Sequence, residues 1–189
     1  MVLGPDRFTE HAQEVINSAQ QILMRYRHNQ LDSEHILLAL IEQEKGVPAE
    51  IFKELGVNLD VLHASLHKLL ESSPKVGGQR NQIYQTPTVG LLFQLADSES
   101  KRFNDEFIAT EHVLIALADK SMPSTSSMLG EFSVTSEEIY KALKKIRGAH
   151  RVTDQKAESR YRSLEKYALD LTSLASEGKL DPIVGRDLE

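Results

Sequence analysis

The segment Glu34-His35-Ile36-Leu37-Leu38-Ala39-Leu40 recurs 77 residues later as Glu111-His112-Val113-Leu114-Ile115-Ala116-Leu117. Five of these seven positions are identical and two are conservative. The same offset, without gaps, gives 12 identities in 63 positions when residues 9–71 are compared with residues 86–148. Self-similarity at a fixed offset is the signature of a duplicated structural unit. We therefore expect two copies of one fold in this chain.

Each copy has the apolar spacing of four helices. Apolar residues recur three and four positions apart, as on the buried face of an amphipathic helix. Residues that cap helices precede these runs, and the predicted caps are Thr9, Asp32 or Ser33, Asn58, Thr86, Thr110 and Thr135. No alternating run of strand length interrupts them. The prediction is an all-α fold, in which two four-helix repeats pack into one pseudo-two-fold domain of eight helices.

The repeats also suggest how the chain is divided. Repeats at about 9–71 and 86–148 predict a domain over residues 1–148, with the loop between them rich in Ser, Pro and Gly. Residues 149–157 are polar and basic and are expected to form a solvated, flexible linker. A further amphipathic helix is expected from Glu158 to about Glu177, within a segment 158–189 that begins a truncated module.

Composition narrows the class of protein. The 189 residues are 40% hydrophobic, enough for a real core. The absence of cysteine excludes disulfide scaffolds, thiolate zinc sites and cysteine nucleophiles. The apolar runs are too short to span a bilayer, and residues 1–9 have no signal-peptide pattern, so we expect a cytoplasmic protein without membrane contact.

Charge is spread unevenly along the chain. The net charge is −6, but residues 1–140 alone carry 11 basic and 20 acidic residues, which argues against nucleic acid as the partner of the main body. Residues 141–162 carry eight basic and two acidic residues. This stretch has two interpretations, a solvated linker or a nucleic-acid-binding segment, and its lack of interleaved aromatic residues favours the linker.

Motifs for catalysis are missing from the sequence. There is no phosphate-binding G-x-x-x-x-G-K-[ST], no G-x-G-x-x-G and no G-x-S-x-G. His63 and His67 share a helix face, but no third metal ligand is near them in sequence. We therefore expect no catalytic residue, no metal site and no enzyme activity in this chain.

The repeated glutamates, Glu34 and Glu111, are the most informative polar residues. A glutamate in the first turn of a helix is stabilising through the helix dipole, which is sufficient reason for either one. Retention in both copies suggests a second interpretation, in which the pair flanks a groove between the repeats and accepts cationic or amide groups of a partner. The sequence leaves both interpretations open.

These motifs resemble the N-terminal domain of the Clp ATPases. The resemblance rests on the repeated block, on the opening Phe8-Thr9-Glu10 and on the C-terminal runs Leu164-Glu165-Lys166-Tyr167 and Gly178-Lys179-Leu180-Asp181-Pro182. Those runs are similar to the start of the first AAA+ module of ClpB-type disaggregases, and ClpC-type unfoldases are close relatives. The resemblance implies an N-domain that engages unfolded or aggregated protein, or an adaptor or co-chaperone, for threading through a homohexameric ring.

The resemblance also implies site residues. Matching the ClpB-type pattern, Thr9, Asp105 and Glu111 would engage substrate. Matching the ClpC-type pattern, Glu34 and Glu111, with Thr9 and Thr86, would receive phosphoarginine, although Asp32 adds a carboxylate beside the first of these sites. Ile183, Val184 and Gly185 resemble the strip that packs on adenine. ATP and magnesium would belong to a full-length relative, and this chain is expected to be a monomer without cofactor.

Overall fold

The computed structural model describes residues 4–43, 46–75, 83–148 and 150–160. Within those ranges the structure is almost entirely helical, as expected. The first repeat contains α1 (Glu10–Arg25), α2 (Ser33–Glu42), α3 (Val47–Glu54) and α4 (Leu59–Ser72). The second contains α5 (Pro87–Arg102), α6 (Thr110–Leu117), α7 (Pro123–Glu131) and α8 (Ser136–Arg147). Two 3-10 turns, η1 (Pro5–Arg7) and η2 (Ala157–Arg160), lie outside the repeats.

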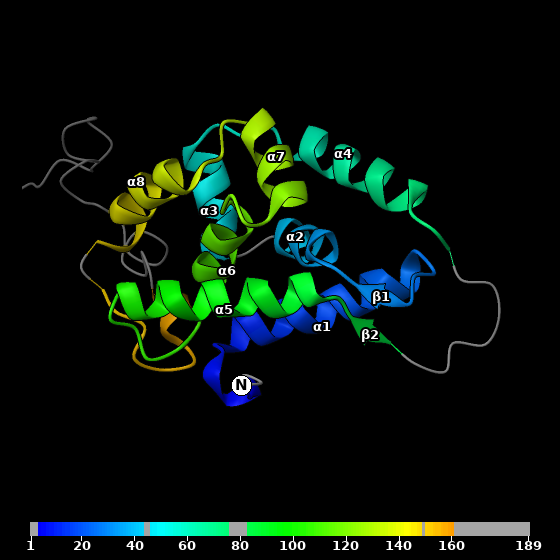
Figure 1. Ribbon diagram of the computed structural model, residues 1–189. Coiled ribbons are helices and arrows are strands. Elements are labelled where there is room, and N and C mark those ends of the chain that lie inside the picture. Colours follow the sequence, from blue (N-terminus) through cyan, green and yellow to red (C-terminus); the bar gives the residue numbers. More distant parts are fainter. Residues whose placement is uncertain (1–3, 44–45, 76–82, 149, 161–189) are drawn as a thin grey trace, which may run out of the picture.

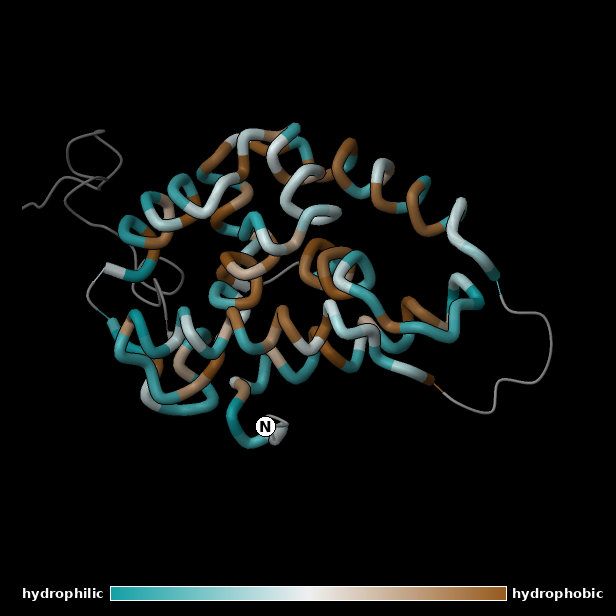
Figure 2. Tube along the Cα trace, viewed as in Figure 1, coloured by the Kyte–Doolittle hydropathy of each residue, from teal (hydrophilic) through white to brown (hydrophobic). Residues whose placement is uncertain are grey.

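The helices form layers around the two copies of the repeated block. Helices α2 and α6 contact each other at the centre, α1 and α5 lie along one side of them, and α3, α4, α7 and α8 cover the other (Figure 1). All eight residues of α6 are buried, as are Ser33 and residues 35–40 of α2. In Figure 2 strongly hydrophobic residues are concentrated on these central helices. A helix that is apolar on nearly every face is stable only when covered on all sides.

The two repeats interlock rather than sit side by side. Helix α3 of the first repeat packs on α6 and α8 of the second, and α2 packs on α5, α6 and α7. The residues before each first helix also pair with the other repeat. The backbone N–H of Thr9 donates to the carbonyl of Ile108 at 3.0 Å, and that of Thr86 donates to the carbonyl of Leu31 at 3.0 Å. These two bonds are related by the 77-residue offset, so the structure is pseudo-two-fold symmetric.

Two short parallel strands, β1 (Gln30–Leu31) and β2 (Tyr84–Gln85), are the β-structure within the described ranges, together with the isolated bridge between Phe8 and Ile108. The offset of 77 maps the Leu31–Gln85 pair onto the Ile108–Phe8 pair. Strands of two residues are too short to show a period-2 pattern, so the sequence could not reveal them.

Most predicted helix starts are confirmed. Thr9 and Thr135 accept hydrogen bonds from first-turn amides, and Asn58 does the same at the start of α4. Asp32, rather than Ser33, caps α2. Thr110 was expected to cap α6, and this is wrong by one position: Ala109 is the N-cap and Thr110 is the first helical residue. The expected helix from Glu158 to Glu177 lies outside the described residues beyond residue 160.

The central helices provide a test of this architecture. Leu114 in α6 is fully buried, so Leu114→Ala should lower the free energy of unfolding by about 2–5 kcal/mol, through lost apolar burial and the cavity left behind. Chemical denaturation followed by circular dichroism measures this change. Val61→Ala, at a side chain that is 50% exposed, is the control and should change it by less than about 0.5 kcal/mol. Equal effects of the two substitutions would contradict the central placement of α6.

Candidate functional site

A groove lies between α1 and α5, on the pseudo-two-fold axis. Its volume is about 630 Å³. Phe8, Ile16 and Phe93 supply apolar surface, and the rings of Phe8 and Phe93 meet edge to face with centroids 5.3 Å apart. Side-chain amides surround them. The complete lining is Pro5, Phe8, Gln13, Ile16, Asn17, Gln20, Gln85, Gly90, Phe93 and Gln94, none of which is charged.

The periodicity of α1 and α5 explains this lining. Residues 12, 15, 19, 22 and 23 of α1 are buried in the core, which turns residues 13, 16, 17 and 20 toward α5. The offset of 77 pairs Ile16 with Phe93, Asn17 with Gln94 and Gln13 with Gly90, so both repeats contribute equivalent positions. Sequence reasoning expected a groove between the repeats but named none of these lining residues, because amides and an apolar pair at the edge of a helix face look like ordinary boundary residues.

Thr9, the first of the predicted site residues, is fully buried. Its Oγ1 accepts the amide of Ala12 at 3.3 Å and donates to Oε2 of Glu158 at 2.6 Å. The other oxygen of Glu158, Oε1, accepts the backbone N–H of Thr110 at 2.8 Å and also the hydroxyl of Thr110. The Glu158 carboxylate therefore joins the start of α1 to the start of α6.

Glu158 supplies the side-chain acceptor that the N-cap of α6 lacks. In the first repeat the Asp32 side chain accepts the N–H of Ser33 at 2.8 Å at the start of α2. Its counterpart in the second repeat is Ala109, which has no acceptor. Because buried first-turn N–H groups must find partners, the carboxylate of Glu158 takes that place from 48 residues away. Sequence reasoning missed this residue; the missing cap at Ala109 was the available signal.

Asp105 lies in the same buried cluster. One of its oxygens, Oδ1, accepts from Nη2 of Arg147 and from the amide of Val152 at 2.8 Å, and Oδ2 is 3.1 Å from Nε2 of His112. Burial on its own would raise the pKa of Asp105. The hydrogen bonds from His112, Arg147 and Val152 outweigh burial and hold the pKa below its ordinary value. Asp105 is therefore ionised, and both of its carboxylate oxygens are engaged by groups of the domain itself.

Glu111 is the most deeply placed of the candidates, with no exposed surface. Its Oε1 lies 3.6 Å from Nη1 of Arg147, whose side chain is 4% exposed. Burial, followed by the nearby Glu158 carboxylate, raises the pKa of Glu111 well above its ordinary value. Arg147 contacts the carboxyl groups of Asp105 and Glu111, and His112 contacts Asp105. The Glu158 carboxylate has Nδ1 of His11 at 3.7 Å from its Oε2.

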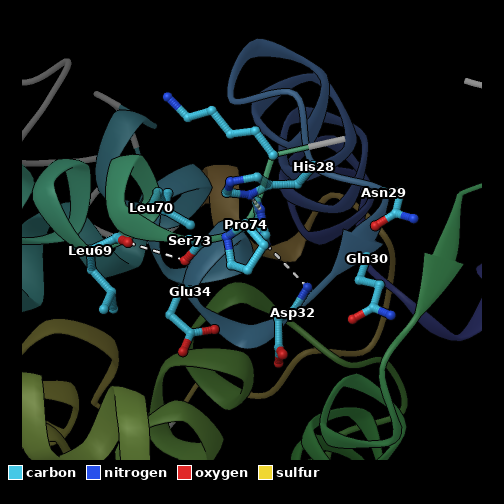
Figure 3. Close-up of a pocket in the computed structure, with 11 residues that line it drawn as sticks. His28, Asn29, Gln30, Asp32, Glu34, Leu69, Leu70, Ser73 and Pro74 are labelled. Carbon is cyan, nitrogen blue, oxygen red and sulfur yellow. Dashed lines mark hydrogen bonds between the residues drawn. The ribbon is translucent and has the colours of Figure 1, made fainter. Parts of the chain in front are cut away.

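Glu34, the counterpart of Glu111, has a different environment. It is half-buried, and its Oε1 accepts the Ser124 hydroxyl at 2.5 Å while Oε2 accepts the Ser33 hydroxyl at 3.2 Å. It borders a pocket of about 370 Å³ in which its carboxylate lies near that of Asp32 (Figure 3). The buried rings of His28 and His35, 2.9 Å apart between Nδ1 and Nε2, stand where the second repeat has Asp105 and His112.

Thr86, the counterpart of Thr9, caps α5 at its backbone only. Its hydroxyl is buried and makes no hydrogen bond within the described part of the chain. The structure therefore gathers Thr9, Asp105 and Glu111 into one cluster and places Glu34 and Thr86 elsewhere. All three clustered residues are covered, so none of them faces solvent in this conformation.

The basic segment after α8 contacts the domain at several of its described residues. Within residues 150–158, Val152 and Ala157 are buried, with 0% and 4% of their surface exposed. Arg147, counted in the basic stretch, is buried in the acidic cluster rather than solvated. Backbone and carboxylate hydrogen bonds connect the described residues 150–157 to the domain, and the flexible linker at 149–157 stays a prediction.

The remaining sequence predictions concern metals and nucleotide. His63 lies 3.5 Å from Oε1 of Glu42, and the ring of His67 packs edge-on against Tyr26. Across the residues that the structure describes, no group of three or more His, Asp or Glu side chains is arranged to hold a metal ion. The adenine strip proposed at Ile183, Val184 and Gly185 lies outside the described residues.

Comparison with known proteins identifies the family. Residues 7–132 match the family model described as the Clp repeat (R) N-terminal domain. The chain belongs to this Clp N-terminal domain family. It is 37% identical over 186 residues to the chaperone protein ClpB of Gloeobacter violaceus and 32% identical over 187 residues to ClpB of Bacillus anthracis. These alignments cover 98% and 97% of the chain but 21% and 22% of the relatives, so the chain spans about a fifth of their length.

Solved Clp N-domains have the same fold. The Hsp104 N-terminal domain from Candida albicans superposes with a TM-score of 0.70 at 20% identity, covering 80% of this chain and 98% of that one. The N-terminal domain of the ClpV1 ATPase from Escherichia coli gives 0.61 at 20% identity, covering 74% and 84%. In the described residues, none of the helices has the length and apolar character needed to cross a membrane.

The raised pKa of Glu111 predicts a specific pH dependence. Its folded pKa lies above the unfolded value near 4.5, so the folded state binds this proton more tightly. Stability from this group therefore grows as pH falls from above the folded pKa toward 4.5. Relative to Glu111→Gln, the wild type should gain up to about 1.4 kcal/mol per pH unit as pH falls from the raised folded pKa toward the unfolded value near 4.5.

Urea denaturation at each pH measures that difference, and the contribution of Asp105 cancels because both proteins retain it. Glu131→Gln, at an exposed glutamate, is the control and should follow the wild-type profile. Parallel stability profiles for Glu111→Gln and the wild type would contradict the buried, proton-binding environment assigned to Glu111.

Replacement of Asp105 should lower the stability of the domain, because this residue pairs with a buried arginine. Asp105→Ala removes a carboxylate partner of the buried Arg147 guanidinium and should lower the free energy of unfolding by about 3–5 kcal/mol. Denaturation of this variant is compared with Asp6→Ala, at an exposed aspartate. If both variants unfold at the wild-type midpoint, the buried cluster does not exist in solution.

Proposed function

We propose that this chain is the substrate-recognition N-domain of a ClpB-type, ATP-dependent protein disaggregase, and that the groove between α1 and α5 binds unfolded or aggregated polypeptide. The observation that carries the proposal is the lining of this groove, an apolar base of Phe8, Ile16 and Phe93 ringed by uncharged amides. Kinship with ClpB chaperones supports the same role.

The chemistry of the groove suits an unfolded segment. Such a segment exposes apolar side chains together with backbone N–H and C=O groups that have lost their partners. The aromatic and aliphatic base can take the apolar side chains, and each Gln or Asn amide both donates and accepts hydrogen bonds. With no charge in the lining, recognition would depend on apolar content more than on one particular sequence.

The size of the groove favours weak, reversible capture. A volume of about 630 Å³ accommodates a few side chains of an extended peptide, within the range of ordinary ligand pockets. Micromolar or weaker affinity fits a domain that passes its ligand to a ring pore. In that role the domain itself would be a monomer in the cytoplasm without cofactor, and ATP with magnesium would be used by the hexameric ring of a full-length protein.

The alternative is docking of an adaptor or of phosphoarginine, as in ClpC-type unfoldases. It requires an accessible Glu34 and an accessible Glu111. Glu34 borders an open pocket with Asp32, but Glu111 has no exposed surface and lies in the cluster with Arg147 and Glu158. The burial of Glu111 therefore favours the groove as the place where a partner binds, and the Glu34 pocket is the position to test for the alternative.

Gly90 allows the groove to be blocked without disturbing the core. It lies in α5, and a Cβ built there meets no atom within 4 Å. Gly90→Trp should fill the groove and weaken binding of a permanently unfolded probe, reduced and carboxymethylated α-lactalbumin, by about tenfold, equivalent to about 1.4 kcal/mol. Titration of labelled probe, followed by fluorescence anisotropy, measures the affinity.

The matched control is Gly130→Trp in α7, where a Cβ also has open space and which lies away from the groove. It should bind the probe like the wild type. Equal affinities of the two tryptophan variants would show that the groove is not the binding site. If a phosphoarginine peptide bound instead, with amide shifts confined to Glu34 and its neighbours, the adaptor-type alternative would replace this proposal.

A further inference from the structure

Residues 150–158, here called the strap, cross from the second repeat to the start of the first. The amide of Val152 donates to Asp105, and the carbonyl of Val152 accepts the amide of Glu106 at 2.9 Å. Further on, the carbonyl of Gln155 accepts the amide of Glu10 at 2.9 Å. At its end, Glu158 binds Thr9 and Thr110. The strap is therefore attached at three separate places.

The way in which the strap is held differs from that of the helices. Only Val152, Ala157 and Glu158 of the strap are buried, so its apolar contact with the domain is small. Hydrogen bonds to carboxylate and carbonyl oxygens supply most of its attachment, and Glu158 alone accounts for three of them. A segment with few apolar contacts opens at lower free energy than the packed core.

Two other titratable side chains lie beside the Glu158 carboxylate. Nδ1 of His11 is 3.7 Å from its Oε2. Burial and the Glu158 carboxylate raise the pKa of Glu111, and a protonated Glu111 shares a hydrogen bond with Glu158. The end of the strap is thus held by polar contacts rather than by apolar packing. At the start of the equivalent helix in the first repeat, α2 carries its own cap at Asp32.

The strap touches the groove through one pair of neighbouring residues. The side chain of Thr9 bonds Glu158, whereas the preceding residue, Phe8, lines the groove and packs on Phe93. Gln13 holds this corner by donating from Nε2 to the carbonyl of Phe8 at 3.0 Å. A docked strap thus fixes Thr9, and through it the place of Phe8 in the groove wall.

We propose that the strap is a releasable part of the domain, locked by the Glu158 carboxylate at the starts of α1 and α6, and that its docking and ligand binding in the groove favour each other. The second half of this statement rests on the proposed function. Coupling between two sites is reciprocal, so a ligand that needs Phe8 in place must also hold the strap down. Release would uncover Thr9, Asp105 and Glu111, the residues that the sequence suggested as a binding site.

The strap is tested first without any ligand. Backbone amide exchange of the full chain is followed at Glu10, Glu106, Thr110 and Val152, whose N–H groups are bonded to or by the strap. Glu158→Ala should accelerate exchange at these amides by about tenfold and leave the amides of α2 at the wild-type rate. The control is Glu131→Ala, at an exposed glutamate, which should leave all of them unchanged.

A second variant is needed because Glu158→Ala also removes the acceptor at the start of α6 and could unfold the domain. Ala157→Asp places a carboxylate at a buried strap position and leaves every residue of the eight helices in place. It should accelerate the same four amides. Wild-type exchange rates at these amides in both Glu158→Ala and Ala157→Asp would overturn the lock. Loss of protection in α2 as well would overturn it too, because the strap would then be inseparable from the core.

The coupling is tested with the carboxymethylated α-lactalbumin probe. Glu158→Ala and Ala157→Asp should each weaken probe binding by about threefold or more, and saturating probe should slow the four amides in the wild type by a similar factor. Released amides with unchanged probe affinity would overturn the coupling alone. If the wild type binds no probe and matches Gly90→Trp, the proposed function fails, while the exchange measurements still decide whether the strap is releasable.

Discussion

Two helices that are apolar on nearly every face must be kept from water, and the rest of the molecule is arranged around that constraint. Helices α2 and α6 cannot be covered by a single neighbour, so each needs helices on both sides. One four-helix repeat is too small to supply them. The other repeat completes the cover, with α3 reaching α6 and α8, and with α2 reaching α7. Pseudo-two-fold symmetry follows because each copy has the same need.

Complete burial of α6 removes water from the N–H groups of its first turn, so these groups need acceptors within the protein. The N–H groups there have no helical acceptor, and Ala109 has no side chain to offer. Glu158 accepts the N–H of Thr110 from beyond the second repeat, and it brings a carboxylate close to Glu111. Arg147 contacts both Glu111 and Asp105. The cluster is therefore a consequence of burial, and the first repeat, where Asp32 caps α2, needs no such distant acceptor.

Prediction from the sequence succeeded where a local rule decides the outcome. Thr9, Asn58 and Thr135 cap helices because their side chains accept bonds from amides two or three positions away. It failed where a partner lies far along the chain. The contacts of residues 150–158 with the carboxylate of Asp105 and the hydroxyls of Thr9 and Thr110 could not be foreseen, because no composition rule contains them. Glu34 and Glu111 occupy equivalent positions in the two repeats, yet Glu34 is half-buried and Glu111 is fully buried.

The helical class, the duplication with its register and the similarity to Clp N-domains could all be read from the sequence, because apolar spacing and caps act over a few residues and the repeat can be counted. Which polar residues are accessible became known from the three-dimensional structure alone. The groove forms where edges of α1 and α5 meet across the axis, and Asp105 and Thr110 find hydrogen-bond partners in a segment more than 40 positions away. Accessibility is a property of neighbours in space, and neighbours in space are not spaced regularly along the chain.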